Sequence, residues 1–412
     1  MGCVCSHSRS DEPADVAASA GGHVKAHDLQ QHPTANTNDA CYVLESSHVD
    51  PTIITTATDI DTSHSSQSSS SIMTGDHHHH TIIVKPSMST CRPSWVEDLD
   101  ADPLLAAISI PYEHLQLQSA SRAAGIFGNV HRATYQAMPV VVHRLDASKL
   151  NDRRLRIFKD DVQLLMRLEH PNIVQFIGAS WTASPSSCCC LVMELPQRGD
   201  LYSMLRSSKY KLAWHKHLLR IATDVATGMM YLHAMDPPVL HRDLQSMHVH
   251  VSSNYVGKVA DVASTPLSAL GSSGVGGTRW MAPERILGLA SGESADVFSF
   301  GICTYLLSEM DTSKLPYEDM GSRHLRSTKH GSMEKATRAS TELLRRIATD
   351  GLRPQMAVNG LATVRALFTR CVSATPSDRP SFADIVTFLK QDVQDEVHAR
   401  FPSSGGGHFW PS

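Results

Sequence analysis

The chain has 412 residues, 41% of them hydrophobic and 19% charged, which suffices for one large domain or two small ones with a buried core. Lysine and arginine number 37 against 41 aspartates and glutamates, so the basic excess of a nucleic-acid-binding protein is absent, and we expect no nucleic-acid partner. No apolar run reaches the roughly 18 residues of a membrane-spanning helix. The nine cysteines, an odd number, fit no disulfide framework, which favours a reducing, intracellular setting.

The first residues match an acylation signal. Gly2 follows Met1 in the pattern M-G-x-x-x-[ST], which is typical of N-myristoylation. One myristoyl chain binds membranes only reversibly, and Cys3 and Cys5 lie where S-palmitoylation would add a second anchor. A chance match with inert thiols is the alternative, because the motif is short. We predict lipid anchoring at the cytoplasmic face of a membrane, with the plasma membrane as the first candidate.

Residues 1–95 are rich in Ser, Thr, His, Asp and Ala and have almost no aromatic residues, which predicts a disordered segment that tethers a folded domain flexibly. The run His77–His80 within it offers clustered imidazoles to zinc or another borderline metal. A tract without fixed geometry or cysteine partners is more often a solvated linker, and we favour that interpretation.

Residues 110–393 have the pattern of a packed domain, with strand-like runs first and helices after them, which predicts an α+β fold. Apolar residues at helical spacing predict two core-facing helices. The first contains Leu155, Phe158, Val162, Leu165 and Leu168, and the second contains Leu218, Ile221, Val225, Met229 and Leu232. The polar stretch between Pro316 and Leu343 predicts an insertion between helices, and residues 394–412 predict a flexible tail.

A glycine-rich stretch opens this domain. Ala123, Gly125, Gly128 and Val130 occupy the marked positions of G-x-G-x-x-G-x-V, with alanine at the first. Glycines there let a strand-turn-strand backbone approach nucleotide phosphates, although the same residues also suit a plain hairpin turn. Taken alone, this pattern is weak.

Further motifs follow in a fixed order along the chain. They are H-P-N-I-V at 170–174, H-R-D-L at 241–244, A-P-E at 282–284, an aspartate that opens an apolar helix at 296, and D-R-P-S-F at 378–382. Together they make the chain resemble a protein kinase catalytic domain of the tyrosine-kinase-like branch, whose members mostly phosphorylate serine and threonine. The resemblance implies a small β-rich N-lobe, a larger helical C-lobe, and ATP and Mg²⁺ as cofactors.

The resemblance also assigns roles to individual residues. Phosphoryl transfer depends on positioning and charge neutralisation. The resemblance implies that Asp243 is the catalytic base and that Asp261 is a metal ligand. The nucleotide-binding positions are Gly125, Gly128, Val130, His143 and the hinge residues Glu194 and Leu195, which follow the gatekeeper position Met193. The structural positions are Asp161, Arg242, Asp296 as a brace for the H-R-D turn, and Glu284 and Arg379 as a buried ion pair.

Several positions depart from the family pattern. His143 replaces the β3 lysine, Asp161 replaces the longer αC glutamate, and His248 replaces the catalytic-loop asparagine. Arg144 should point to the opposite face from His143, since successive strand residues alternate. A nearby carboxylate is expected to raise the pKa of His143. Imidazole suits softer ions than Mg²⁺, so the second magnesium site should be weakened.

Three further departures from the family pattern lie in the H-R-D loop and in the segments that follow it. Gln245 stands where a lysine is usual, D-F-G appears as Asp261-Val262-Ala263, and Gly277 takes the place of a threonine. These replacements remove groups that stabilise the transition state of phosphoryl transfer. We therefore favour a membrane-anchored pseudokinase that recruits signalling proteins as a scaffold or regulator. The alternative is an active serine/threonine kinase that uses ATP with Mg²⁺ or Mn²⁺ and keeps Asp243 and Asp261 as its two carboxylates.

Overall fold

The computed structural model describes residues 94–125, 128–146, 151–182, 188–262, 277–309, 315–317 and 333–402. The acylation motif and the histidine run lie outside the described residues. Two short helices, α1 (Ser94–Asp100) and α2 (Pro103–Ala107), precede the expected start of the domain at residue 110. They belong to the packed structure because Leu99 and Leu105 are buried in its largest hydrophobic cluster.

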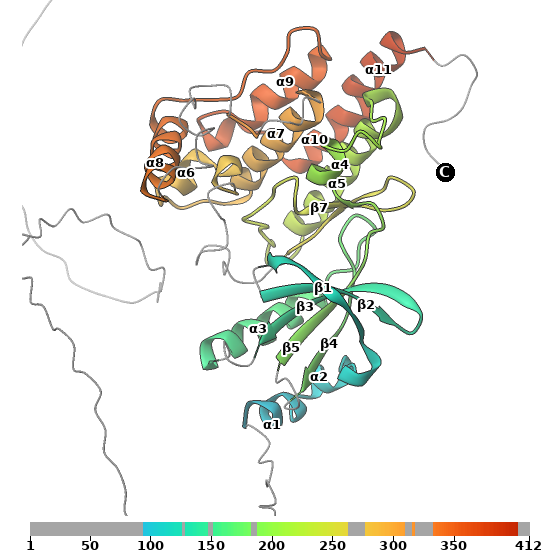
Figure 1. Cartoon of the computed structure of the whole chain (residues 1–412). Coiled ribbons are helices and arrows are strands. Elements are labelled where there is room, and N and C mark those ends of the chain that lie inside the picture. The colour runs from blue at the N-terminus through green and yellow to red at the C-terminus, as the bar shows by residue number, and fades with distance from the viewer. Residues whose placement is uncertain are drawn as a thin grey trace, which may run out of the picture. The chain divides into compact units, whose positions relative to one another are not determined.

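A five-stranded antiparallel sheet with the order β1-β2-β3-β5-β4 forms the N-terminal part (Figure 1). Its strands are β1 (Gln116–Gly125), β2 (Gly128–Tyr135), β3 (Met138–Asp146), β4 (Phe176–Thr182) and β5 (Cys188–Glu194). Helix α3 (Asp152–Leu165) connects β3 to β4, and its Phe158 and Val162 pack in the same cluster as Leu191 and Met193 of β5. This helix therefore covers the face of the sheet to which these β5 residues point.

Side chains that alternate along β3 and β5 pack in two different hydrophobic clusters, one on each face of the sheet. Val140 and Val142 pack with Cys188 and Cys190 on one face, in a cluster distinct from the one that holds Leu191. His143 is the register partner of Leu191, so the strand period of two residues directs it to the other face.

The chain ahead of the sheet is tied to α3 and β4. Lys159 of α3 donates a hydrogen bond to the backbone carbonyl of Asp98 at 3.3 Å and lies 3.9 Å from the Asp102 carboxylate. Trp181 of β4 donates from its indole to the Asp100 carboxylate at 2.8 Å. Polar contacts thus add to the burial of Leu99 and Leu105 in holding α1 and α2 in place.

The C-terminal part is helical and includes a small three-stranded sheet with the order β6-β7-β8, which contacts α4 and α5 (Figure 1). In chain order its elements are β6 (Gly199–Asp200), α4 (Leu201–Leu205), a π turn (Trp214–Leu218), α5 (Leu219–His233), β7 (Val249–Val251), β8 (Gly257–Val259), a 3₁₀ turn (Gly277–Trp280), α6 (Pro283–Ile286), α7 (Glu293–Glu309), α8 (Met333–Thr349), α9 (Ala362–Cys371), a 3₁₀ turn (Pro376–Asp378), α10 (Phe382–Phe388), a π turn (Leu389–Val393) and α11 (Gln394–Arg400). The α+β prediction with a β-rich N-lobe and a helical C-lobe is confirmed.

The two helices predicted from apolar spacing are present as α3 and α5. Two boundaries differ from expectation. Helix α8 begins at Met333, inside the interval expected to be an insertion, and it buries Leu343 and Ile347. The expected tail begins with α11, in which Val397 is buried and the Glu396 carboxylate accepts hydrogen bonds from the backbone N–H groups of Ala362 and Thr363 at 2.8 Å. None of the described helices is long and apolar enough to cross a bilayer.

Candidate functional site

A cavity of about 580 Å³ is lined by strands of the five-stranded sheet, by the segment after β5 and by the loops next to β7 and β8. The expected site residues that line it are Val130, His143, Glu194, Leu195, Asp243 and Asp261. Gly125 and Gly128 are register partners at the end of the β1-β2 hairpin, and the turn between them lies outside the described residues. The fold thus brings most of the expected nucleotide-binding residues to one cavity.

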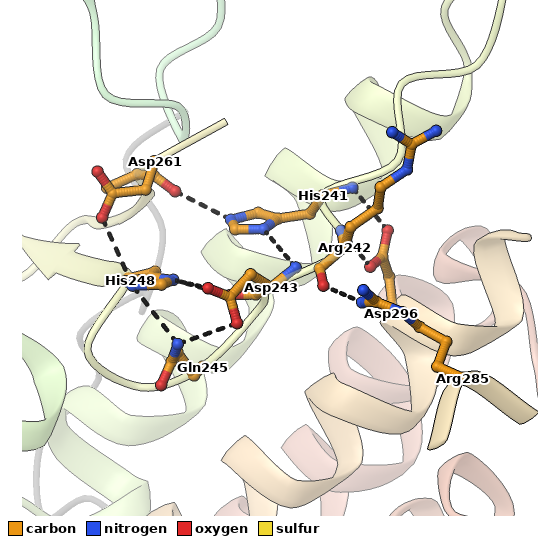
Figure 2. Close-up of polar contacts among 9 residues, drawn as sticks. His241, Arg242, Asp243, Gln245, His248, Asp261, Arg285 and Asp296 are labelled. Carbon is orange, nitrogen blue, oxygen red and sulfur yellow. Dashed lines mark hydrogen bonds and ion pairs between the residues drawn. The ribbon is translucent and has the colours of Figure 1, made fainter. Parts of the chain in front are cut away.

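Asp296, near the start of α7, holds the turn that carries Asp243 (Figure 2). Its carboxylate accepts the backbone N–H groups of His241 and Arg242, both at 2.8 Å, and lies 3.1 Å from the ring of His233. Arg242 has a φ of 64°, a left-handed conformation that these two hydrogen bonds stabilise. Arg242 therefore contributes to this turn through its backbone, and its carbonyl also accepts a hydrogen bond from Arg285.

The ring of His241 has a defined role in the same turn. Its Nδ1 accepts the backbone N–H of Asp243 at 3.3 Å, so its Nε2 carries the proton and donates to the carbonyl of Ala260 at 2.9 Å. Burial lowers the pKa of His241 despite the nearby Asp296. A neutral ring thus links the H-R-D turn to the segment that leads to Asp261.

The carboxylate of Asp243 is held by a neighbour that the sequence pattern did not indicate. Gln245 donates from its side-chain amide to Asp243 Oδ1 at 3.0 Å. Burial raises the pKa of Asp243 and is opposed by the nearby His248. A glutamine at this position therefore occupies one oxygen of Asp243 with a neutral donor, where a lysine would bring a positive charge.

His248 lies between the two carboxylates (Figure 2). Its Nδ1 is 2.7 Å from the backbone carbonyl of Asp243, and its Nε2 is 3.7 Å from Asp261 Oδ2 and 3.5 Å from the amide nitrogen of Gln245. Burial opposes ionisation of Asp261, but His248 and His143 outweigh it, so the pKa of Asp261 is lowered. The ring of His248 thus takes a central position between the catalytic and metal-binding positions of the family.

His143 lines the cavity, and its pKa lies below the ordinary value of histidine. Burial lowers its pKa more than the charge of Asp261 raises it. A nearby carboxylate thus raises the pKa of His143 as expected, but desolvation exceeds this effect and the pKa is lowered overall. The carboxylate that acts on His143 is Asp261, whereas Asp161 is a buried residue of α3.

Arg144 points to the opposite face, as the strand alternation predicted. The pKa of Cys188 is lowered to about 6 by a hydrogen bond from Cys190 and, against burial, by a hydrogen bond from Arg144. Both cysteines pack in the cluster behind the sheet, with their sulfur atoms 3.8 Å apart. The guanidinium of Arg144 is therefore not a substitute for the missing lysine.

These residues fit the family's magnesium arrangement only in part. Asp261 offers a carboxylate, but His248 presents a ring nitrogen at the position of an oxygen ligand, and Mg²⁺ prefers octahedral oxygen coordination. Across the described ranges, no group of three or more His, Cys, Asp or Glu side chains is arranged to hold a metal ion. The site does not fit two magnesium ions.

The hinge offers few backbone donors to a base. Glu194 donates its N–H to the carbonyl of Gln175 at 2.9 Å, and its carboxylate accepts Lys258 of β8 at 2.6 Å. Pro196 has no N–H, so this position of the hinge cannot donate a backbone hydrogen bond to a base.

The pair expected between Glu284 and Arg379 is formed away from the cavity. Arg379 donates two hydrogen bonds to the Glu284 carboxylate, at 2.6 and 2.8 Å, and both residues are buried. Burial opposes ionisation of Glu284, but the contacts with Arg379 outweigh it and lower its pKa. This bidentate pair joins α6 to the segment that precedes α10.

Comparison with known proteins identifies related sequences. Residues 119–389 match a family model described as protein tyrosine and serine/threonine kinase. The probable serine/threonine-protein kinase drkB of Dictyostelium discoideum is 31% identical over 268 residues, which cover 65% of this chain and 35% of that protein. The serine/threonine-protein kinase CTR1 of Arabidopsis thaliana is 33% identical over 304 residues, which cover 73% of this chain and 34% of that protein. The Arabidopsis serine/threonine-protein kinase STY17 is 32% identical over 296 residues, or 70% and 46% of the two chains, so the matches span less than half of each relative.

Proposed function

Since the chain belongs to the protein tyrosine and serine/threonine kinase family, we propose that it is a membrane-anchored pseudokinase, which uses the kinase fold as a binding module and transfers phosphate weakly or not at all. The observation that carries this proposal is the position of His143 in the cavity wall, where the family has a lysine. An imidazole whose pKa is lowered by desolvation brings less positive charge to nucleotide phosphates than a lysine does.

Two further contacts support the same conclusion. His248 presents an imidazole where an oxygen ligand for magnesium is required, and Gln245 brings no charge to the loop. ATP with Mg²⁺, when bound, would supply the phosphoryl group, and Asp261 would be the residue that holds the ion. The remaining residues would orient the nucleotide but stabilise its transition-state charge poorly.

An active serine/threonine kinase is the second candidate. Asp243 and Asp261 both line the cavity, and a carboxylate with a raised pKa, such as Asp243, is a stronger base than an ordinary aspartate. This candidate requires nucleotide binding without the β3 lysine. Its substrates would be the serine and threonine hydroxyls of proteins.

The two candidates are separated by measuring melting temperature with ATP, with and without Mg²⁺, together with autophosphorylation from labelled ATP. We expect a small ATP-dependent shift and no transfer above that of Asp243→Asn. Transfer that requires Mg²⁺ and disappears in Asp243→Asn would overturn the pseudokinase proposal. The variant also controls for contaminating kinases, since those would label both proteins equally.

The membrane part of the proposal rests on Gly2, Cys3 and Cys5, which match acylation sites in the sequence. A lipid-anchored binding module would bring signalling proteins to the cytoplasmic face of a membrane, and the cavity and lobe surfaces would provide the contacts.

A further inference from the structure

The segment from Arg198 to Asp224 is strongly basic. It contains six lysines and arginines against two aspartates, although the chain as a whole has a formal net charge of −4. The segment includes β6, α4, the π turn before α5 and the first part of α5. Its basic side chains are all exposed or half-buried, and they are Arg198, Arg206, Lys209, Lys211, Lys216 and Arg220.

The turn between β7 and β8 gathers part of this charge. The guanidinium carbon of Arg198 lies 3.8 Å from the centroid of the Tyr255 ring, and the ring of His217 stacks on Tyr255 with 3.6 Å between centroids. Two groups so close to one centroid cannot share a face, so Tyr255 lies between them. Arg198 also donates two hydrogen bonds to the carbonyl of Ser253, at 3.0 and 2.6 Å. The guanidinium is therefore held in place beside the turn.

Other cations surround the His217 ring. Arg220 of α5 donates a hydrogen bond to the carbonyl of Asn254 in the same turn, at 3.3 Å. Burial lowers the pKa of His217, and three nearby positive charges lower it further, those of Arg198, Lys216 and Arg220. Side chains from three separate segments thus place their charges around one ring.

A second aromatic ring connects this group to the lysines that precede it. The Tyr210 ring lies 5.6 Å from Lys209 Nζ and 5.7 Å from the guanidinium carbon of Arg198, both within the range of cation–π contacts. Lys211 is the exposed neighbour of Tyr210 in sequence. We call the surface formed by these cations the basic surface, and its members are Arg198, Lys209, Lys211, Lys216 and Arg220.

The two aspartates of the segment do not cancel this charge. Asp200 caps α4 by accepting the backbone N–H of Ser203 at 2.7 Å. Asp224 lies 3.8 Å from Arg220 Nε and accepts the backbone N–H of Gly257. Its carboxylate therefore offsets Arg220, and the lysines of the basic surface keep their full charge.

Aromatic side chains lie next to the basic surface. The Phe401 ring is 40% exposed and stacks on His215 of the π turn with 4.5 Å between centroids. Tyr202 and Tyr210 are half-buried. Lysine and arginine beside tyrosine and phenylalanine are typical of protein surfaces that lie in the interfacial region of a membrane. An acidic protein would be recognised by the charges alone, so this combination favours a bilayer.

We propose that the basic surface binds the anionic headgroups of a membrane leaflet, with phosphatidylserine as the representative lipid. Lysines and arginines near such a leaflet are attracted by its negative surface potential. One acyl chain binds membranes only reversibly, and a basic surface is a sufficient second attraction. This last role rests on the acylation proposed above, whereas the binding of anionic lipid by the folded domain does not depend on it.

The test uses the full chain with Gly2→Ala, which prevents N-myristoylation, produced in bacteria. Cosedimentation is measured with phosphatidylcholine vesicles that contain or lack phosphatidylserine. We expect binding of modest affinity only when phosphatidylserine is present, and release in about 0.5 M NaCl, because salt screens exposed charges. Changing the three exposed lysines to glutamine should weaken binding at least about tenfold, in the variant Lys209→Gln, Lys211→Gln, Lys216→Gln.

A matched control removes three exposed arginines outside the basic surface, and it is Arg153→Gln, Arg156→Gln, Arg370→Gln. This control should bind the vesicles like the parent, and circular dichroism shows whether both triple variants fold. Equal binding with and without phosphatidylserine, or equal binding by the two triple variants, would overturn the proposal. Lysine-dependent binding of a polyglutamate peptide without binding to the vesicles would also overturn it, and would indicate an acidic protein as the partner.

Incorporation of labelled myristate into the wild-type chain separates this inference from the proposed function. Labelling that is absent, together with vesicle binding by the Gly2→Ala chain, would refute the acyl anchor and leave the basic surface as a lipid-binding site. Labelling at Gly2 without vesicle binding by the Gly2→Ala chain would refute the basic surface and leave the anchor intact.

Discussion

His143 shows how burial decides the chemistry of a single position. Its pKa is lowered from the ordinary value of 6.5, so the ring gains its proton only as the pH falls below that value. The imidazole NMR signal of His143 is assigned as the one that the His143→Ala variant lacks. We predict that this signal does not titrate between pH 8 and 7 in the ligand-free protein. A midpoint above 6.5 would show that the Asp261 carboxylate outweighs desolvation.

Restoring the family residues at two positions of the cavity should strengthen the binding of ATP with Mg²⁺. We expect His143→Lys combined with His248→Asn to raise the affinity for ATP with Mg²⁺ about tenfold or more, equivalent to roughly 1.4 kcal/mol, because a charge and an oxygen ligand return to the cavity. Calorimetric titration measures the change, and His114→Lys is the control for a lysine added at an exposed site. Unchanged affinity in a folded double variant would indicate that Val262 or Met193, which line the cavity, obstruct the nucleotide.

Motif spacing located Asp243, Asp261 and the replaced positions at His143 and His248, since order along the chain suffices for that. It did not indicate that Gln245 would bond to Asp243 or that His248 Nε2 would face Asp261. Those contacts depend on rotamers and on the turn geometry imposed by Asp296, which no local pattern encodes.

At the level of elements, the Glu284–Arg379 pair joins α6 to the region before α10. Glu284→Ala leaves a buried guanidinium without its carboxylate and is expected to lower the free energy of unfolding by about 3–5 kcal/mol. Urea denaturation measures this loss. The control is Glu342→Ala on α8, whose partner Arg345 lies 3.0 Å away on the surface, and its unfolding midpoint should stay close to that of the parent. Equal effects of the two substitutions would contradict the structural role of the buried pair.

The contact between α5 and β8 contains a carboxylate whose ionisation is costly. Burial raises the pKa of Asp224 to about 6, although its Oδ2 accepts the backbone N–H of Gly257 at 2.9 Å. The folded protein therefore binds a proton more tightly than the unfolded chain, and this stabilisation is lost as the pH rises through 6.

Asp224→Asn keeps an acceptor for Gly257 and removes the charge. Between pH 5 and 7 the parent should lose about 1.4 kcal/mol of stability relative to this variant, as measured by urea denaturation at both values. Asp395→Asn, which changes an exposed residue of α11, serves as the control with no such difference. A constant difference between parent and Asp224→Asn at the two pH values would mean that Asp224 has an ordinary pKa.

Helices α3 and α5 could be predicted from sequence because each places apolar residues on one face at helical spacing. Helix α8 could not, since its buried Leu343 and Ile347 lie near its end and its first turns are polar. The helix is formed where tertiary packing buries this short apolar face, and propensity alone gives no clear signal there.

For the whole molecule, attachment to membranes is predicted from the first residues. Gly2→Ala removes the acylated amine and should move the protein from the membrane fraction to the soluble fraction. Fractionation of cells that express each form measures this, with Ser10→Ala, which lies outside the motif, as the control. Persistence of Gly2→Ala in the membrane pellet would place the anchor elsewhere.

The contacts of Lys159 with Asp98 and Asp102 give the folded region a path for mechanical load. Tension applied to the chain ahead of Ser94 reaches α1 first and is resisted by these polar contacts and by the buried Leu99. Asp161 lies on the same helix as Lys159, two residues further along. A pull from the N-terminal side would therefore reach the helix that carries Asp161 through Lys159, and strand β4 through the hydrogen bond from Trp181 to Asp100.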